Sequence, residues 1–272
     1  MQEKIEELEK KAKIVREEVL KMVSQAGSGH IAGPLSTIDI LVALYFSVMK
    51  YDVQNPDWKD RDRLILSHGH VCPALYAVMA EAGYFPKIEL QNLRKFGSNL
   101  QGHPHREWLR GLETSSGPLG EGLSQAVGMA LAEKINNLES EKKFFCLMSD
   151  GELQEGQVWE ALMLAGHKKI NNLIAIIDRN NIQISGNTED VVSLEPLRDK
   201  LEAFNWDVLE INGHDFEQIL GAFVTAKAIL DKPVVIIAHT IAGKGFKELE
   251  DDYHWHGKAP SQKLVEKILK NN

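Results

Sequence analysis

Hydrophobic residues recur along the chain in two alternating patterns, one with helical spacing and one in short continuous runs. Apolar residues at helical spacing extend to about Gln25, and the segment PLSTIDILVALYFSVM predicts a second helix beginning near Ser36 or Thr37. Short runs rich in branched residues predict strands between further helices. The expected strands are 63–67, 143–149, 172–178, 206–211 and 233–240, and the further helices are about 71–82, 122–138, 155–168 and 214–231.

This alternation predicts an α/β fold, with a mostly parallel sheet and helices on both faces. In such folds, ligands bind beyond the carboxyl ends of the strands. No repeat, low-complexity linker or interior boundary divides the chain, so we expect residues 1–272 to form a single domain. The longest irregular stretch runs from 243 to 260.

Composition and charge exclude several classes of partner. The 31 basic and 39 acidic side chains give a formal charge of −8, which argues against a nucleic-acid surface or an anionic membrane as the partner. No stretch approaches the about 18 apolar residues of a membrane span, and the N-terminus is too charged for a signal peptide. Only Cys72 and Cys146 occur, so we expect reduced thiols and a cytoplasmic protein.

Two successive strands end in polar residues. In CLMSDGELQEGQVWEA (146–161), Asp150 is expected to end a strand and Gly151 to lead into a helix, which offers a carboxylate and free N–H groups together. The next strand runs into IIDRNNIQISG, which brings Asn180 and the Ile182 carbonyl to the same rim. Such oxygens suit Mg²⁺ or Ca²⁺, with Mn²⁺ possible, and do not suit zinc. Taken singly, Asp150 is more simply a helix cap and Asn180 a turn residue, but together they favour a metal site.

Asp150-Gly151 followed by Asn180-Asn181 resembles the thiamine diphosphate-binding motif, and DGELQEGQVWEA resembles transketolases in particular. The motif usually opens with Gly-Asp-Gly, whereas this chain has Ser149 in the first position. The likeness extends from SGHIAGPLSTIDILVALY to WHGKAP, nearly the whole chain. It implies the thiamine diphosphate-binding fold, with Gly151 at the diphosphate and with Asp150, Asn180 and the Ile182 carbonyl on Mg²⁺.

The segment ETSSGPLGEG supplies a second part of the resemblance. Gly117, Pro118 and Leu119 match the loop that the family places against the cofactor rings. Glycine and proline make a fixed turn whose backbone can approach a flat ring closely. The simpler alternative is an ordinary loop before a helix.

Histidines in loop-like contexts form a further set of candidates. By resemblance, His70 and His256 approach the cofactor diphosphate, while His30, His103 and His256 line the channel in which sugar hydroxyls lose and regain protons. Imidazole suits this task because its pKa lies near the working pH. Each histidine taken alone is more simply a satisfied loop or core residue, and we assign no role to His68.

Three glutamates, Glu152, Glu155 and Glu160, follow the Asp150-Gly151 pair. Glu155 and Glu160 match acids that in the family lie near the subunit interface and link two active sites as a proton relay. Charged groups buried at an interface require protonation or a partner. For Glu152 we expect a solvated position in the first turn of a helix.

The resemblance covers only the diphosphate-binding domain of a longer, three-domain enzyme. We therefore expect the N-terminal subunit of a two-polypeptide transketolase, with the pyrimidine-binding and C-terminal domains on a partner chain in an α₂β₂ heterotetramer. A piece cut from a longer chain is the competing explanation. The expected reaction is thiamine diphosphate- and Mg²⁺-dependent transfer of a two-carbon ketol unit from a ketose phosphate to an aldose phosphate, as in the pentose phosphate pathway.

Two alternatives remain open. One is a subunit of another thiamine diphosphate enzyme, such as 1-deoxyxylulose 5-phosphate synthase or a decarboxylating dehydrogenase, although TSSGPLG and GHPH favour transketolase. The other is a noncatalytic regulatory subunit with the same fold.

Overall fold

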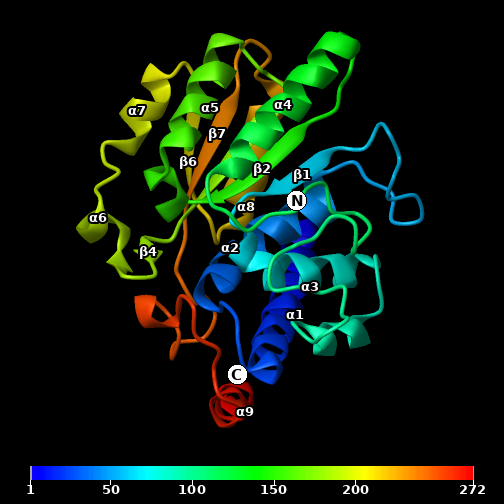
Figure 1. Ribbon diagram of the computed structural model, residues 1–272, viewed down its shortest axis with the longest axis vertical. Helices are drawn as coiled ribbons and strands as arrows, with labels where there is room; N and C mark the ends of the chain where they lie inside the picture. The colour runs from blue at the N-terminus through cyan, green and yellow to red at the C-terminus, as the bar shows by residue number, and fades with distance from the viewer. Residues whose placement is uncertain (1, 272) are drawn as a thin grey trace.

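Five parallel strands form the central sheet of the computed structural model, which describes residues 2–271 (Figure 1). The strand order is β1-β2-β3-β7-β6, and every neighbouring pair is parallel. These strands are β1 (Arg63–Leu66), β2 (Phe144–Ser149), β3 (Leu173–Arg179), β6 (Asp207–Asn212) and β7 (Val234–His239). A separate antiparallel pair is formed by β4 (Ile182–Gln183) and β5 (Gly186–Asn187). The expected five strands and parallel sheet are confirmed.

Helices cover both faces of the sheet. One face packs against α1, α2, α3 and α8, and the other packs against α4, α5 and α7. Figure 1 shows α4 and α5 together on one side of the strands and α1, α2 and α3 on the other. The helices are α1 (Gln2–Ala26), α2 (Ala32–Ala43), α3 (Cys72–Ala82), α4 (Glu121–Asn136), α5 (Gly156–His167), α6 (Thr188–Val191), α7 (Leu197–Ala203), α8 (Phe216–Ala228) and α9 (Gln262–Asn271).

Strand β2 shows how the sequence builds the two cores. All six of its residues are buried. Because successive side chains in a strand point to opposite faces, Phe145 and Leu147 enter the core beside α1, α2 and α3, whereas Cys146 and Met148 enter the core beside α4 and α5. A strand buried on both faces therefore reads as a continuous apolar run in the sequence.

The start of α2 was predicted wrongly. The helix begins at Ala32, before the expected start at Ser36 or Thr37. Pro34 fits the first turn because the first N–H groups of a helix have no intrahelical acceptor. Ser36 does not cap the helix. Its hydroxyl donates to the Gly33 carbonyl at 2.8 Å and to Asp178 Oδ2 at 2.6 Å.

Two further boundaries differ from expectation. Strand β2 ends at Ser149, so Asp150 is the first residue after the strand and caps the 3₁₀ turn η4 (Gly151–Gln154). The stretch expected as one helix from 155 begins as α5 only at Gly156. Residues 243–260 are irregular as expected, apart from the short 3₁₀ turn η5 (Tyr253–Trp255). Within residues 2–271, no helix is both long and apolar enough to cross a membrane.

Candidate active site

A cavity of about 540 Å³ lies where the carboxyl ends of β1, β2 and β3 meet the irregular segments. It brings together most of the residues expected from the sequence, although these come from segments far apart in the chain. Its wall includes His30, His68, His70, His103, Gly117, Leu119, Gly151, Glu155, Asn180, Ile182 and His256. Pro118, Asp150 and Glu160 are the candidates that do not line it.

Three imidazoles form a compact cluster in this cavity. The ring centroids of His30 and His70 lie 4.8 Å apart, those of His70 and His256 5.1 Å, and those of His30 and His256 5.3 Å. Burial lowers the pKa of His30 to about 4, with further lowering by His256, and burial also lowers the pKa values of His70 and His256. The three side chains are therefore neutral near pH 7, and each can donate one proton and accept another.

His103 and the loop at Gly117 lie against each other at the outer part of the cavity. A Cβ atom on Gly117 would lie 3.7 Å from His103 Cγ, so the glycine backbone packs closely on the imidazole ring. His103 is exposed overall, but part of its ring is shielded from water, and this partial burial, followed by the charge of Arg94, lowers its pKa. Leu119 lines the cavity, whereas Pro118 is exposed outside it.

His68 is a wall residue to which the sequence assigned no role. It is fully buried, and its Nδ1 lies 2.9 Å from the Leu147 carbonyl oxygen. Burial lowers the pKa of His68 to about 4. Its Nε2 is buried without a hydrogen-bond partner among the described residues. The signal in the sequence was the His-Gly-His run directly after a strand.

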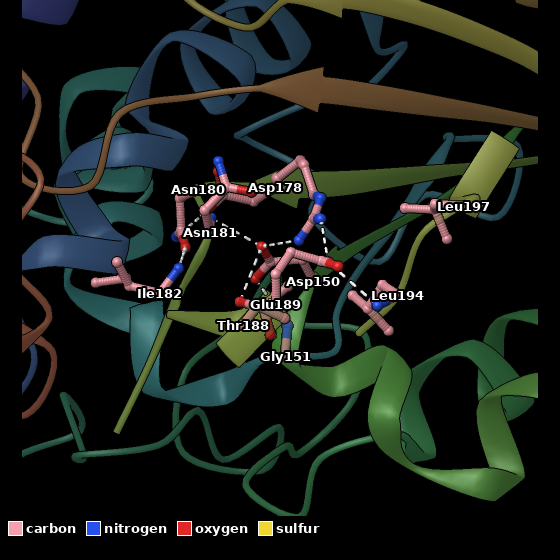
Figure 2. Close-up of polar contacts among 12 residues, drawn as sticks. Asp150, Gly151, Asp178, Asn180, Asn181, Ile182, Thr188, Glu189, Leu194 and Leu197 are labelled. Atoms are coloured by element: carbon pink, nitrogen blue, oxygen red, sulfur yellow. Dashed lines mark hydrogen bonds and ion pairs between the residues drawn. The ribbon is translucent and has the colours of Figure 1, made fainter. Parts of the chain in front are cut away.

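Asp150 lies beneath the cavity wall and is fully buried. Its Oδ1 accepts from the Gly151 N–H at 2.7 Å, and its Oδ2 accepts from the Asn181 N–H at 2.8 Å and from Arg179 Nη1 at 2.9 Å (Figure 2). Burial raises the pKa of Asp150, and the Arg179 ion pair opposes that rise. Oδ1 thus has one partner among the described residues, whereas Oδ2 has three, the third being the Thr188 hydroxyl at 3.3 Å. Arg179 was not among the site residues expected from the sequence.

Asn180 is held in place by Asp178, a second residue that was not among the expected site residues. The Asn180 Nδ2 donates to Asp178 Oδ2 at 2.8 Å, and its Oδ1 accepts from the Ile182 N–H at 3.1 Å (Figure 2). Asp178 is fully buried and also accepts from the hydroxyls of Ser36 and Thr240. Burial raises the pKa of Asp178 to about 7. The network fixes which way the Asn180 amide faces.

The donor atoms at this rim fit the expected cofactor and metal. A carboxylate, an amide oxygen and a backbone carbonyl are hard ligands for a divalent cation of the Mg²⁺ type. The cavity wall also contains buried polar atoms without partners among residues 2–271, namely His30 Nδ1, His68 Nε2 and Gln183 Oε1. Because buried polar atoms are normally satisfied, these atoms indicate a polar ligand in the cavity.

Glu152 contradicts its expected position. It is fully buried instead of solvated, and burial raises its pKa. Its carboxylate accepts from the Gly120 N–H at 2.6 Å, from the Ser67 hydroxyl and from the Ser149 N–H at 3.3 Å. The 3₁₀ turn after β2 directs the side chain inward, where a regular first helical turn would have left it outside. Glu152 thus joins the ends of two strands to the start of α4.

Glu155 and Glu160, the expected interface acids, are both exposed. Glu155 lines the cavity, whereas Glu160 lies on α5 outside it. The geometry of the described chain leaves both side chains accessible to a partner.

The sheet, the cavity at its carboxyl edge and the oxygen donors there define a cofactor-binding α/β domain. A sequence profile of the family described as "Transketolase, thiamine diphosphate binding domain" matches residues 8–271. The chain belongs to this transketolase family.

Two curated relatives match over nearly their whole lengths. The 6-deoxy-6-sulfo-D-fructose transketolase subunit SqwG of Clostridium sp. (strain MSTE9) is 42% identical over 270 residues, which cover 99% of this chain and 96% of that protein. An apulose-4-phosphate transketolase subunit of Phocaeicola vulgatus is 41% identical over 266 residues, which cover 98% of this chain and 94% of that protein.

Solved structures are similar throughout the chain. Transketolase from Leishmania mexicana superimposes with a TM-score of 0.92 at 34% identity, and that from Campylobacter jejuni with a TM-score of 0.89 at 39% identity, each over 97% of this chain. The chain spans 41% and 42% of the length of these two transketolases.

Proposed function

We propose that the chain is the N-terminal subunit of a two-polypeptide transketolase that transfers a two-carbon ketol unit from a ketose phosphate to an aldose phosphate. The main support for this proposal is the cavity whose wall contains Asn180 and three neutral imidazoles with ring centroids 4.8–5.3 Å apart. Two relatives named as transketolase subunits, which this chain matches along 96% and 94% of their lengths, support the two-polypeptide organisation.

The residues at the rim suit the cofactor and its metal. Thiamine diphosphate, when bound, supplies the carbon nucleophile and the electron sink for the reaction. Asp150 Oδ1, Asn180 Oδ1 and the Ile182 carbonyl would hold Mg²⁺, with Ca²⁺ and Mn²⁺ as alternatives that favour the same donors. Gly151, His70 and His256 would face the diphosphate. Gly117 and Leu119 would face the rings, and Pro118 would support their turn from outside the cavity.

The histidines would move protons of the sugar. A neutral imidazole accepts a hydroxyl proton at one nitrogen and returns it later, which suits His30 and His256 in the inner part of the cavity. His103 lies further out, where it can donate to or accept from a second hydroxyl and thereby orient the donor. The low pKa values of these groups keep a lone pair free at neutral pH.

A partner chain would complete the enzyme. It would carry the pyrimidine-binding and C-terminal domains and the contacts for substrate phosphate, in a cytoplasmic heterotetramer with two copies of each chain. Glu155 and Glu160 are exposed in the described chain and would become interface groups in that assembly.

Assays of separate and mixed chains test the proposal. A candidate partner is a pyrimidine-domain chain encoded by a neighbouring open reading frame. We expect ketol transfer with thiamine diphosphate and Mg²⁺ only in the mixture. Full activity of this chain alone would refute the two-polypeptide organisation.

Two further results would favour the alternatives. Release of CO₂ from pyruvate by the mixture would indicate an enzyme of the 1-deoxyxylulose 5-phosphate synthase or decarboxylating type. Calorimetry that detects no Mg²⁺-dependent binding of thiamine diphosphate, with or without the partner, would indicate a noncatalytic subunit.

A further inference from the structure

Arg94 lies between the two loops that carry His30 and His103. A Cβ atom on Gly29 would lie 3.3 Å from Arg94 Nε, and a Cβ atom on Gly102 would lie 2.7 Å from Arg94 Cζ. Each of these glycines directly precedes one of the two histidines. The guanidinium therefore lies between the two loops, although Arg94 as a whole is exposed, and both glycines leave room for it.

The backbone holds Arg94 at this place. Its φ is 60°, a left-handed conformation that non-glycine residues adopt rarely. The Arg94 N–H donates to the Leu100 carbonyl at 2.8 Å, which closes the turn before the His103 loop. An uncommon conformation that is fixed by a hydrogen bond beside a candidate active site points to a role for the side chain.

Arg94 has no carboxylate partner among residues 2–271. Six of the eight arginines form ion pairs with aspartate or glutamate. The polar contact of the Arg94 guanidinium is a long one, from Nη2 to the Gly102 carbonyl at 3.5 Å. Its positive charge consequently acts on the neighbouring imidazoles. It lowers the pKa of His103, after burial, and adds to the effects of burial and of His256 on the pKa of His30.

We propose that Arg94 is a positioning residue of the candidate active site, whose guanidinium sets the spacing and orientation of the His30 and His103 loops. Its effect on turnover rests on the proposed function, whereas the placement of the two histidines does not. Arg94 does not line the cavity, so it acts through the two histidines and not by touching substrate.

Histidine-labelled NMR of this chain alone tests the placement. In Arg94→Met we expect the imidazole signals of His30 and His103 to move, and the pKa of His103 to rise because a screened positive charge is lost. Arg94→Lys keeps the charge without the planar group, so it should restore the His103 titration while the signals remain displaced.

Gly102→Ala provides an independent second variant. Gly102 does not have a positive φ, so alanine adds only a methyl group where the guanidinium now lies, and the flexible arginine can move aside. We expect this variant to displace the His30 and His103 signals as Arg94→Met does. The matched control is Lys95→Met, which removes the same charge from an exposed neighbour that contacts Asn92, and it should leave both histidines unchanged.

The assembled enzyme provides the functional test. We expect Arg94→Met to lower kcat/KM about tenfold and to shift the acidic limb of the pH profile upward, with an unchanged affinity for thiamine diphosphate. Imidazole signals of His30 and His103 identical to wild type in both Arg94→Met and Gly102→Ala would overturn the proposal. If the His30 and His103 signals are displaced in the variants but the chain shows no ketol transfer with any partner, the positioning role of Arg94 would be supported. Only the proposed function would then be refuted.

Discussion

The Glu152 carboxylate accepts a hydrogen bond from the Gly120 N–H at 2.6 Å, across 32 positions of sequence. This contact joins the turn after β2 to the start of α4, directly behind the loop at Gly117 that faces the cavity. The Ser67 hydroxyl donates to the same carboxylate and accepts from the Gly122 N–H at 3.1 Å. The position of the cavity loop therefore depends on one buried acid.

Removing that acid should destabilise the fold. We expect Glu152→Ala to lower the free energy of unfolding by about 2–4 kcal/mol, because the Gly120 N–H and the Ser67 hydroxyl would remain buried without an acceptor. Glu152→Gln should cost less, since its amide oxygen can replace one contact. Urea denaturation measures both, with the exposed Glu160→Ala as control. Equal losses in Glu152→Ala and Glu160→Ala would contradict the buried contacts.

Alanine substitutions at two glycines of α4 should have opposite effects on the stability of the fold. A Cβ atom on Gly122 would lie 2.6 Å from Ser67 Cα, so Gly122→Ala should destabilise by about 1–3 kcal/mol through overpacking. A Cβ atom on Gly128 would meet nothing within 4 Å, so Gly128→Ala should stabilise by about 0.5–1 kcal/mol through its higher helix propensity. Thermal and urea unfolding would show the two signs, and a neutral Gly122→Ala would refute the close approach to β1.

Buried His68 should make stability depend on pH. Its pKa is about 4 in the folded chain, whereas the ordinary value is 6.5, so between these values the unfolded chain binds the extra proton. Stability conferred by the neutral imidazole is therefore lost as the pH falls below about 6.5. The difference in unfolding free energy between wild type and His68→Gln should rise with pH by up to about 1.4 kcal/mol per unit from pH 4 to 6.5, and then remain flat. Urea titrations at several pH values measure this, and a constant difference would contradict it.

Arg179 should compete with the metal for Asp150. Besides Asp150, it contacts Glu189 at 2.5 Å and Glu195 at 3.1 Å, and its side chain is 4% exposed. Arg179→Met should lower the unfolding free energy by about 3–5 kcal/mol, because it leaves a buried carboxylate without its counter-ion.

Adding Mg²⁺ with thiamine diphosphate should then raise the melting temperature of Arg179→Met more than that of wild type, since the cation replaces the lost charge. The control is Arg198→Met, because Arg198 pairs with Glu202 and Glu210 on the surface. Equal stabilisation of wild type and Arg179→Met would show that Asp150 is not coupled to the cation.

The sequence was a reliable guide to the fold because the strands are short apolar runs and the helices have a clear period. The family resemblance also assigned Asn180, His30, His70, His103 and His256 to one site, and all five line the same cavity. The start of α2 was missed because Pro34 was not recognised as a first-turn residue and Ser36 resembles a cap.

Contacts between distant segments were beyond the reach of sequence patterns. Glu152 has the local context of a first-turn acid, and only the 3₁₀ turn after β2 shows that it points inward. Asp178 lies in a run of strand residues, and its partners Ser36 and Thr240 are 142 and 62 positions away. Arg94 has no neighbouring motif, and its place between Gly29 and Gly102 depends entirely on how the loops fold.

The two-sided burial of β2 has a consequence for where Asp150 can be. A slip of this strand by one residue against β3 would exchange the side chains of its two faces, sending Phe145 and Leu147 into the space shaped for Cys146 and Met148. Both hydrophobic layers would have to be rebuilt at once. The packing of these apolar side chains on both faces of β2 therefore fixes the position of the Asp150 carboxylate along the sheet. This position does not require a bound ligand.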